Sequence, residues 1–156
     1  MNKKLKLMLA IGIVPLLTAC GGNGNKLVCS QERLAGVYKQ DIIIKFNSDK
    51  NEIIGTDLKA VVKISKDKPS QLGCEDKTDE ECLDDIIKTM EETCNGSDSL
   101  VENCQVSNKS KTGFTFKAHV KDGSLQDYFG EINIKSPMDE IKNSMETALG
   151  SNTICE

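Results

Sequence analysis

The chain has 156 residues, the length of one domain, and a formal net charge of −4. This acidic balance argues against nucleic acid as a partner and against electrostatic attraction to anionic lipid. Aromatic residues make up only 4% of the chain and tryptophan is absent, so a large stacking platform for bases or sugars is not expected.

The first residues have the pattern of a secretory signal. Lys3, Lys4 and Lys6 precede an apolar run over residues 7–17. A membrane-spanning helix needs about 20 residues, so this run is too short for a transmembrane anchor.

The run leads into Leu17-Thr18-Ala19-Cys20. This tetrapeptide resembles the lipobox of bacterial lipoproteins: Leu, a small or β-branched residue, Ala or Gly, then Cys. The resemblance implies that residues 1–19 are removed as a signal peptide and that the thiol of Cys20 receives a diacylglycerol group. It therefore implies a protein anchored by lipid to the cell membrane, facing the extracytoplasmic side, with the bilayer as its partner. The alternative is an ordinary signal peptide with a chance cysteine.

Cleavage before Cys20 would leave 17 basic and 24 acidic residues, a net charge of −7. Residues 20–28 are rich in glycine and asparagine at their start, and we expect a flexible tether there. Residues 29–156 are expected to form a single disulfide-bonded domain, because an even number of cysteines in an exported domain favours disulfides. A metal site is disfavoured, because no C-x-x-C pair is present. The six cysteines of the domain are Cys29, Cys74, Cys82, Cys94, Cys104 and Cys155.

Two segments near the start of the domain alternate between apolar and polar residues. In residues 37–46 and in residues 54–64, apolar side chains occupy every second position, so they share one parity of the strand. Phe46 and Ile54 are among these apolar positions. Turn-forming Asn, Ser and Asp residues separate the segments. The pattern predicts a β-hairpin with one buried face.

The period changes to three and four over residues 79–94, which predicts an amphipathic helix capped by Thr78 or Asp79. A second hairpin is expected from residues 100–107, with Cys104 and Val106 facing inward, and from the alternating segment that ends at Val120.

The segment 126–135 is ambiguous between a strand and a helical turn. Ser136 and Pro137 then predict the start of a last helix, with Ser136 as its cap and Gly150 at its end. Together the elements predict an α+β domain: an antiparallel sheet of two hairpins with two helices on one face.

This order of elements resembles a group of small uncharacterised bacterial lipoproteins. The likeness rests on a Leu-Val-Cys-Ser segment around Cys29, a strand–turn–strand of the form Ile-Ile-Lys-Phe-Asn…Asp-Lys-Asn-Glu-Ile, a helix, a second hairpin and a final helix before the penultimate Cys155. The four cysteines between positions 74 and 104 depart from the shorter members. The resemblance implies a fold and a location but no activity.

Position in the chain predicts the disulfide pairing. Cys29 and Cys155 lie near the two ends of the domain, and we expect them to pair. Pairing of Cys82 with Cys94 is excluded if both lie on one helix, because 12 residues span about 18 Å and bridged Cα atoms lie within about 7 Å. This leaves two arrangements. Of these, Cys74–Cys82 with Cys94–Cys104 is preferred over Cys74–Cys94 with Cys82–Cys104.

No set of residues in the sequence predicts catalysis, a metal site or a cofactor. The only histidine, His119, lies on the polar parity of its strand, where a solvated side chain is expected. A dense acidic segment from Glu75 to Asp85 does not match the sequence pattern of a calcium-binding loop. We therefore expect a non-enzymatic binding or interaction module. The alternative is a lipoprotein that binds a small ligand or a divalent cation through the acidic segment or a gap between sheet and helices.

Overall fold

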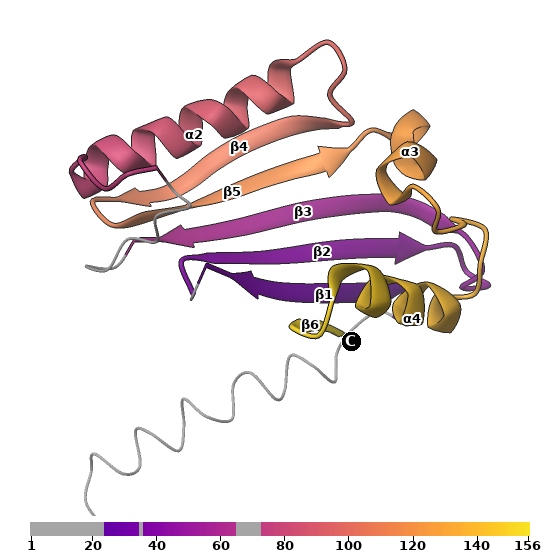
Figure 1. The fold of residues 1–156 in the computed structure, drawn as a ribbon. Coiled ribbons are helices and arrows are strands. Elements are labelled where there is room, and N and C mark those ends of the chain that lie inside the picture. The colour runs from indigo at the N-terminus through magenta and orange to yellow at the C-terminus, as the bar shows by residue number, and fades with distance from the viewer. Residues whose placement is uncertain (1–23, 35, 65–72) are drawn as a thin grey trace, which may run out of the picture.

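The computed structural model describes residues 24–34, 36–64 and 73–156, and their fold is α+β (Figure 1). Six strands form one antiparallel sheet in the order β4-β5-β3-β2-β1-β6. The strands are β1 (Lys26–Arg33), β2 (Tyr38–Phe46), β3 (Ile53–Lys63), β4 (Val101–Ser110), β5 (Gly113–Val120) and β6 (Thr153–Cys155).

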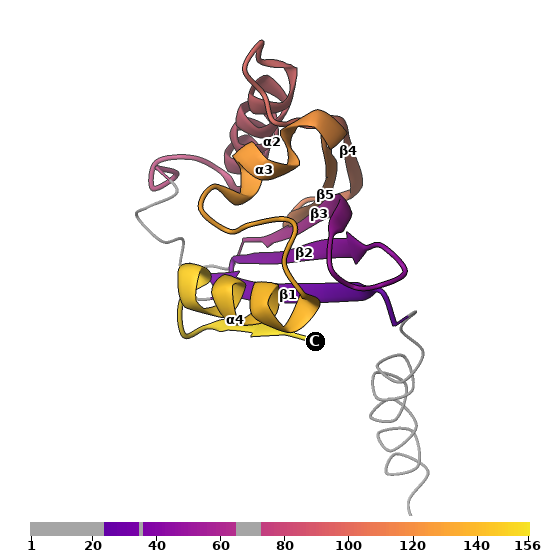
Figure 2. The ribbon, with the colours of Figure 1, turned by 90° about the vertical axis from the view of Figure 1, so that its right-hand side faces the viewer.

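Three α-helices cover the same face of this sheet. They are α2 (Asp79–Asn95), α3 (Leu125–Phe129), which follows a short 3₁₀ turn, and α4 (Met138–Leu149). Figure 2 shows all three helices on one side of the strands. The sequence analysis predicted two hairpins and two helices, so strands β1 and β6 and helix α3 add to the predicted layout.

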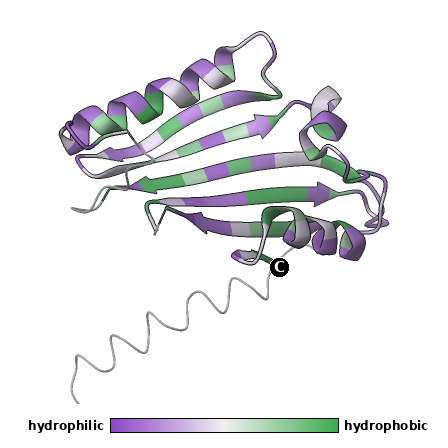
Figure 3. Cartoon of the chain, in the orientation of Figure 1, coloured by the Kyte–Doolittle hydropathy of each residue, from purple (hydrophilic) through white to green (hydrophobic). Residues whose placement is uncertain are grey.

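The strand register explains why all helices share one face. Ile42 of β2 lies opposite Leu58 of β3, which in turn lies opposite Ala118 of β5, and directly opposed residues of neighbouring antiparallel strands point to the same side. The alternation is visible along the strands in Figure 3. Apolar side chains therefore gather on one face, which the helices must cover to remove it from water.

The core under the helices consists of two clusters. One lies beneath α3 and α4 and is centred on β1 and β2, with Ile44 and Ile141 fully buried. The other lies beneath α2 and is centred on β3 and β5, with Leu83 and Phe114 almost fully buried. Leu58 packs against both clusters.

A β-bulge corrects one detail of the first predicted hairpin. The register shifts between Lys45 and Phe46, so that Phe46 pairs with Ile53. Ile53 is therefore buried, whereas Ile54, which alternation placed in the core, is 56% exposed. An extra residue in a strand reverses the side-chain parity beyond it, and this reversal is not visible in the local sequence.

The second hairpin also contains bulges. Strand β4 continues to Ser110, three residues beyond the predicted end, and its register against β5 shifts twice. Asn103 and Asn108 lie at these shifts with φ of 54° and 52°, a conformation that asparagine tolerates better than most residues. Cys104 and Val106 pack partly buried against the α2 cluster, as predicted.

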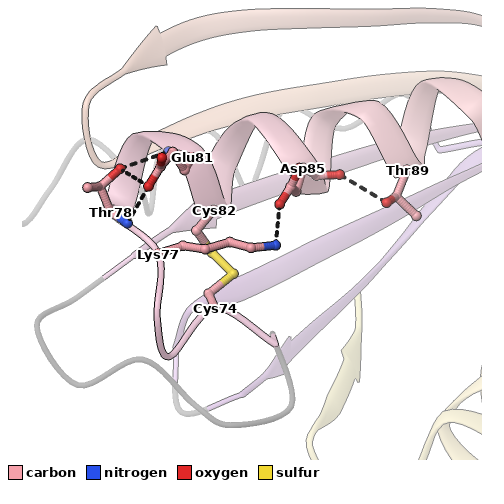
Figure 4. Close-up of polar contacts among 7 residues, drawn as sticks. All are labelled: Cys74, Lys77, Thr78, Glu81, Cys82, Asp85 and Thr89. Carbon is pink, nitrogen blue, oxygen red and sulfur yellow. Dashed lines mark hydrogen bonds and ion pairs between the residues drawn. A yellow bond between two sulfur atoms is a disulfide. The ribbon is translucent and has the colours of Figure 1, made fainter.

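Helix α2 begins as the sequence predicted. Thr78 is its N-cap and accepts a hydrogen bond from the backbone N–H of Glu81, while the Glu81 carboxylate accepts one from the backbone N–H of Thr78 (Figure 4). This capping box satisfies two donors that the helix start would otherwise leave unpaired. The Cys74–Cys82 disulfide ties the preceding segment to the first turn of the helix.

The segment after β5 resolves the ambiguity of residues 126–135 in favour of a helical turn. Helix α3 ends at Phe129 and the residues up to Ser136 form no strand. The Gln126 side chain donates to the carbonyls of Gly130 and Ile132, which holds the turn closed.

The start of α4 differs from the prediction by one residue. The N-cap is Pro137, and no side chain caps the helix. Ser136 is therefore not the cap, although it is buried. The expected apolar stripe is present, with Ile141 and Met145 buried in the core.

The C-terminal tail forms a strand that the sequence did not predict. Strand β6 pairs antiparallel with β1, and Cys155 lies directly opposite Cys29. Their Cα atoms are 4.0 Å apart and the side chains form a disulfide. Strand β1 begins at Lys26, so residues 26–28, which we assigned to the tether, belong to the sheet.

The other two disulfides also join the pairs that the sequence favoured. Cys74 and Cys82 have Cα atoms 5.5 Å apart, and those of Cys94 and Cys104 are 6.3 Å apart. Cys94–Cys104 fastens the end of α2 to β4. Three disulfides in one small domain fit an oxidising, extracytoplasmic compartment.

The three disulfides should stabilise the domain unequally. We expect the Cys29→Ala/Cys155→Ala variant to lose more free energy of unfolding than the Cys74→Ala/Cys82→Ala variant. The bridged residues are 126 apart in the first case and 8 in the second, which gives about 5 and about 2.5 kcal/mol on the chain-entropy model. Urea unfolding of both variants measures the difference. An equal loss, or a larger loss from the shorter loop, would contradict this ranking.

Candidate functional site

A groove between α2 and the sheet has a mostly apolar lining. Its volume is about 260 Å³, close to the lower limit of about 300 Å³ for small-molecule pockets. Leu58, Ala60 and Phe116 lie on its sheet side, and Thr89 and Met90 lie on its helix side.

The groove exists because the helices divide the sheet between them. Helix α2 packs over the β4–β5 half, whereas α4 packs over β1 and β6. Central strand residues such as Tyr38 and Leu58 lie where neither helix covers them completely, and both are only partly buried. The residues that line the groove thus come from the side of α2 that faces the sheet and from the strand positions whose side chains face the helices.

Tyr38 gives the groove a polar component, whereas Tyr128 on α3 does not line it. Burial raises the pKa of Tyr38, although the charge of Arg33 acts in the opposite direction. Burial, together with the neighbouring Tyr38 phenol, raises the pKa of Tyr128 to about 12. The Tyr38 hydroxyl is not hydrogen-bonded to another residue that the structure describes, so it is free to bond to a ligand in the groove.

The opposite face of the sheet carries the only histidine. His119 Nδ1 lies 2.7 Å from a carboxylate oxygen of Asp57, and Nε2 lies 3.4 Å from Asp122. Asp57 also pairs with Lys45 at 2.6 Å. The β3–β5 register brings these groups together, because Asp57 lies directly opposite His119.

The two members of this pair shift one another's protonation. The hydrogen bond to Asp57 is the main cause that raises the pKa of His119, with a smaller contribution from Asp122 and opposition from partial burial. Burial acts to raise the pKa of Asp57, but the hydrogen bonds from Lys45 and His119 outweigh it and lower that pKa. The interaction favours a charged pair.

A histidine oriented by an aspartate is one part of a catalytic dyad or triad. The shallow hollow beside His119 is lined by Ile43, Leu58, Asn103 and other residues, none of them Ser, Thr or Cys among those described. No hydroxyl or thiol nucleophile therefore lies next to the imidazole. We interpret the Asp57–His119 pair as a cross-strand ion pair of the sheet surface.

The acidic segment is neutralised only in part. Lys77 pairs with Asp85 at 2.5 Å (Figure 4), and Lys109 pairs with Asp84 at 2.7 Å. Glu81 is engaged in the capping box. Among the described residues, no group of three His, Cys, Asp or Glu side chains is arranged to hold a metal ion.

The sequence analysis identified some of these features and missed others. It placed His119 on the polar face but did not pair it with Asp57, which is 62 residues away in the chain. A search for opposite charges on the polar parity of predicted neighbouring strands would have found this pair. The gap between sheet and helices was anticipated only as a possibility without residues.

Cys20, the predicted lipidation site, and residues 1–19, the predicted signal peptide, lie outside the described residues. Within the described part, no helix has the length and apolar composition needed to cross a membrane. No protein-family model, curated protein or solved structure matches the chain.

The His119 environment can be tested because the chain has one histidine. We expect its imidazole signal in an NMR titration to have a midpoint above the usual value of about 6.5. Asp57→Asn should return the midpoint toward 6.5, whereas Asp122→Asn should shift it less, because Asp122 is farther from the ring and largely exposed. A midpoint that does not change in Asp57→Asn would contradict the assignment.

The same interaction makes stability depend on pH. A pKa raised in the folded state means that the folded protein binds the proton more tightly. The stabilisation is therefore complete below about pH 6.5 and is lost as the pH rises through the folded-state pKa. Urea unfolding should show this loss in the wild type and a smaller one in Asp57→Asn.

Proposed function

We propose that the protein is a lipid-anchored extracytoplasmic binding module, without enzymatic activity, that holds a small and mostly apolar ligand. The observation that carries the proposal is the groove beneath α2, which combines an apolar lining with the Tyr38 hydroxyl that no described residue engages. A ligand with a short apolar body and one hydrogen-bonding group would satisfy both parts of the site.

The size of the groove favours a small molecule over a protein segment. An α-helix with its side chains has a diameter of about 10–12 Å, and seating one would require far more space than 260 Å³. The alternative of a divalent cation has less support, because Lys77 and Lys109 already pair with two carboxylates of the acidic segment.

The anchor is the second part of the proposal. It is supported by the four-residue lipobox match at Cys20 and by the disulfides, which fit an exported domain. Two buried acyl chains, at about 0.8 kcal/mol per methylene, would hold the domain stably at the membrane.

Acylation can be tested by metabolic labelling of producing cells with a palmitate analogue. We expect label on the wild-type protein and none on Cys20→Ser, because the acyl groups depend on the Cys20 thiol. Cys20→Ser should also accumulate as a precursor of higher mass. Equal labelling of both proteins would contradict the anchor.

Ligand binding can be tested with the apolar dye 8-anilinonaphthalene-1-sulfonate as the probe. We expect Thr89→Trp, at the rim of the groove, to weaken dye binding about tenfold, because the indole would occupy space between α2 and the sheet. Lys88→Trp is the matched control, since its exposed side chain on the same helix does not line the groove. Equal dye affinity in the two variants would show that the dye binds elsewhere.

A further inference from the structure

None of the helices that the structure describes covers one face of the sheet, and the lysines on this face outnumber its carboxylates. The register places six lysines and five carboxylates on this face, with His119 in addition; the fifth carboxylate is that of Glu156, whose backbone exchanges two hydrogen bonds with Val28. We call it the lysine face; its lysines are Lys26, Lys39, Lys45, Lys59, Lys63 and Lys117.

Only two of these lysines are neutralised by ion pairs. Lys45 pairs with Asp57, and Lys59 lies 4.0 Å from Asp41. The remaining four are exposed and form no ion pair with a described residue. With six lysines against five carboxylates, the lysine face carries a small net positive charge, although the chain as a whole is acidic.

The negative charge is concentrated on the other side of the molecule. Helix α2 contains seven carboxylates and one lysine, and it covers the opposite face of the sheet (Figures 1 and 2). A helix is about 10–12 Å in diameter, and the Debye length at physiological ionic strength is about 8 Å. A surface that meets the lysine face therefore experiences its local charge rather than the net charge of the protein.

The start of the described chain lies on the same side. Lys26, the first residue of β1, belongs to the lysine face, because it lies directly opposite Lys45. In Figure 2 the indigo start of the chain leaves the sheet on the side away from α3 and α4. Five residues lie between Cys20 and Lys26, and the six steps from one to the other span at most about 20 Å. An acyl anchor on Cys20 would thus hold Lys26 close to the lipid headgroups.

We propose that the lysine face lies against the anionic headgroups of the bilayer in which Cys20 is anchored, so that α2 and the groove face away from the membrane. This inference rests on the proposed function, because it needs the anchor at Cys20. It also reverses the expectation that an acidic chain has no electrostatic attraction to anionic lipid: that expectation assumed evenly distributed charge.

The test uses the full acylated protein in vesicles of phosphatidylcholine alone or with one third phosphatidylglycerol. Lysines are acetylated briefly and quantified by mass spectrometry. On the anionic vesicles we expect Lys39, Lys63 and Lys117 to react about fivefold more slowly than on the neutral vesicles. This protection should disappear at high salt, because the attraction is screened. Lysines on the helical side, Lys88, Lys135 and Lys142, should react equally on both.

Matched variants separate the contribution of the lysine face from general charge. Replacing Lys39, Lys63 and Lys117 together with Gln should abolish the protection of Lys26 on anionic vesicles. The triple replacement of Lys88, Lys135 and Lys142 with Gln removes the same charge from the other side and should leave Lys26 protected.

The outcomes distinguish failure of the anchor from failure of the docking. If the protein does not float with phosphatidylcholine vesicles, the anchor is wrong and the inference falls with it. If it floats with both vesicle types but the lysine face reacts equally on both, the anchor stands and the docking is overturned. Protection of the helical-side lysines instead would overturn the proposed orientation.

Discussion

The structure depends on the register of β2, β3 and β5. Because Ile42, Leu58 and Ala118 lie directly opposite one another, the apolar parities of three strands coincide on one face. A shift of one residue between any two of them would place apolar side chains on both faces. Because the apolar side chains share one face, the described helices pack on that face. The other face has mainly polar and charged side chains.

Helices of limited length then have to cover a six-stranded sheet. Helix α2 covers one half, and α3 and α4 cover the other, which produces two core clusters that meet at Leu58 and Val101. Disulfides fasten each half separately: Cys94–Cys104 holds the end of α2 on β4, and Cys29–Cys155 holds the strand that follows α4 on β1. The groove lies where the cover is incomplete, so the candidate site follows directly from this division.

The two sides of the sheet differ in charge, and the overall composition does not show this difference. Helix α2 of this acidic chain contains seven carboxylates, whereas the bare sheet face contains four exposed lysines without an ion pair to a described residue. The lysine face, which includes Lys26, and the groove beneath α2 lie on opposite sides of the sheet, so the anchor proposed at Cys20 would join the domain on the side away from the groove. Such an arrangement would keep the groove accessible while the other face meets the membrane.

Much of this fold was determined by the sequence alone. Periodicity identified the helices 79–94 and 138–149 and both hairpins, and helix geometry excluded Cys82–Cys94 pairing, because these signals are local. The tertiary structure decided the rest: the bulge that exposes Ile54, the pairing of β6 with β1, and the meeting of Asp57 with His119. These features depend on contacts between segments distant in the chain, and a local pattern of residues does not specify which segments meet or in which register. The groove also belongs to this second group, since it is defined by the space that packed helices leave uncovered.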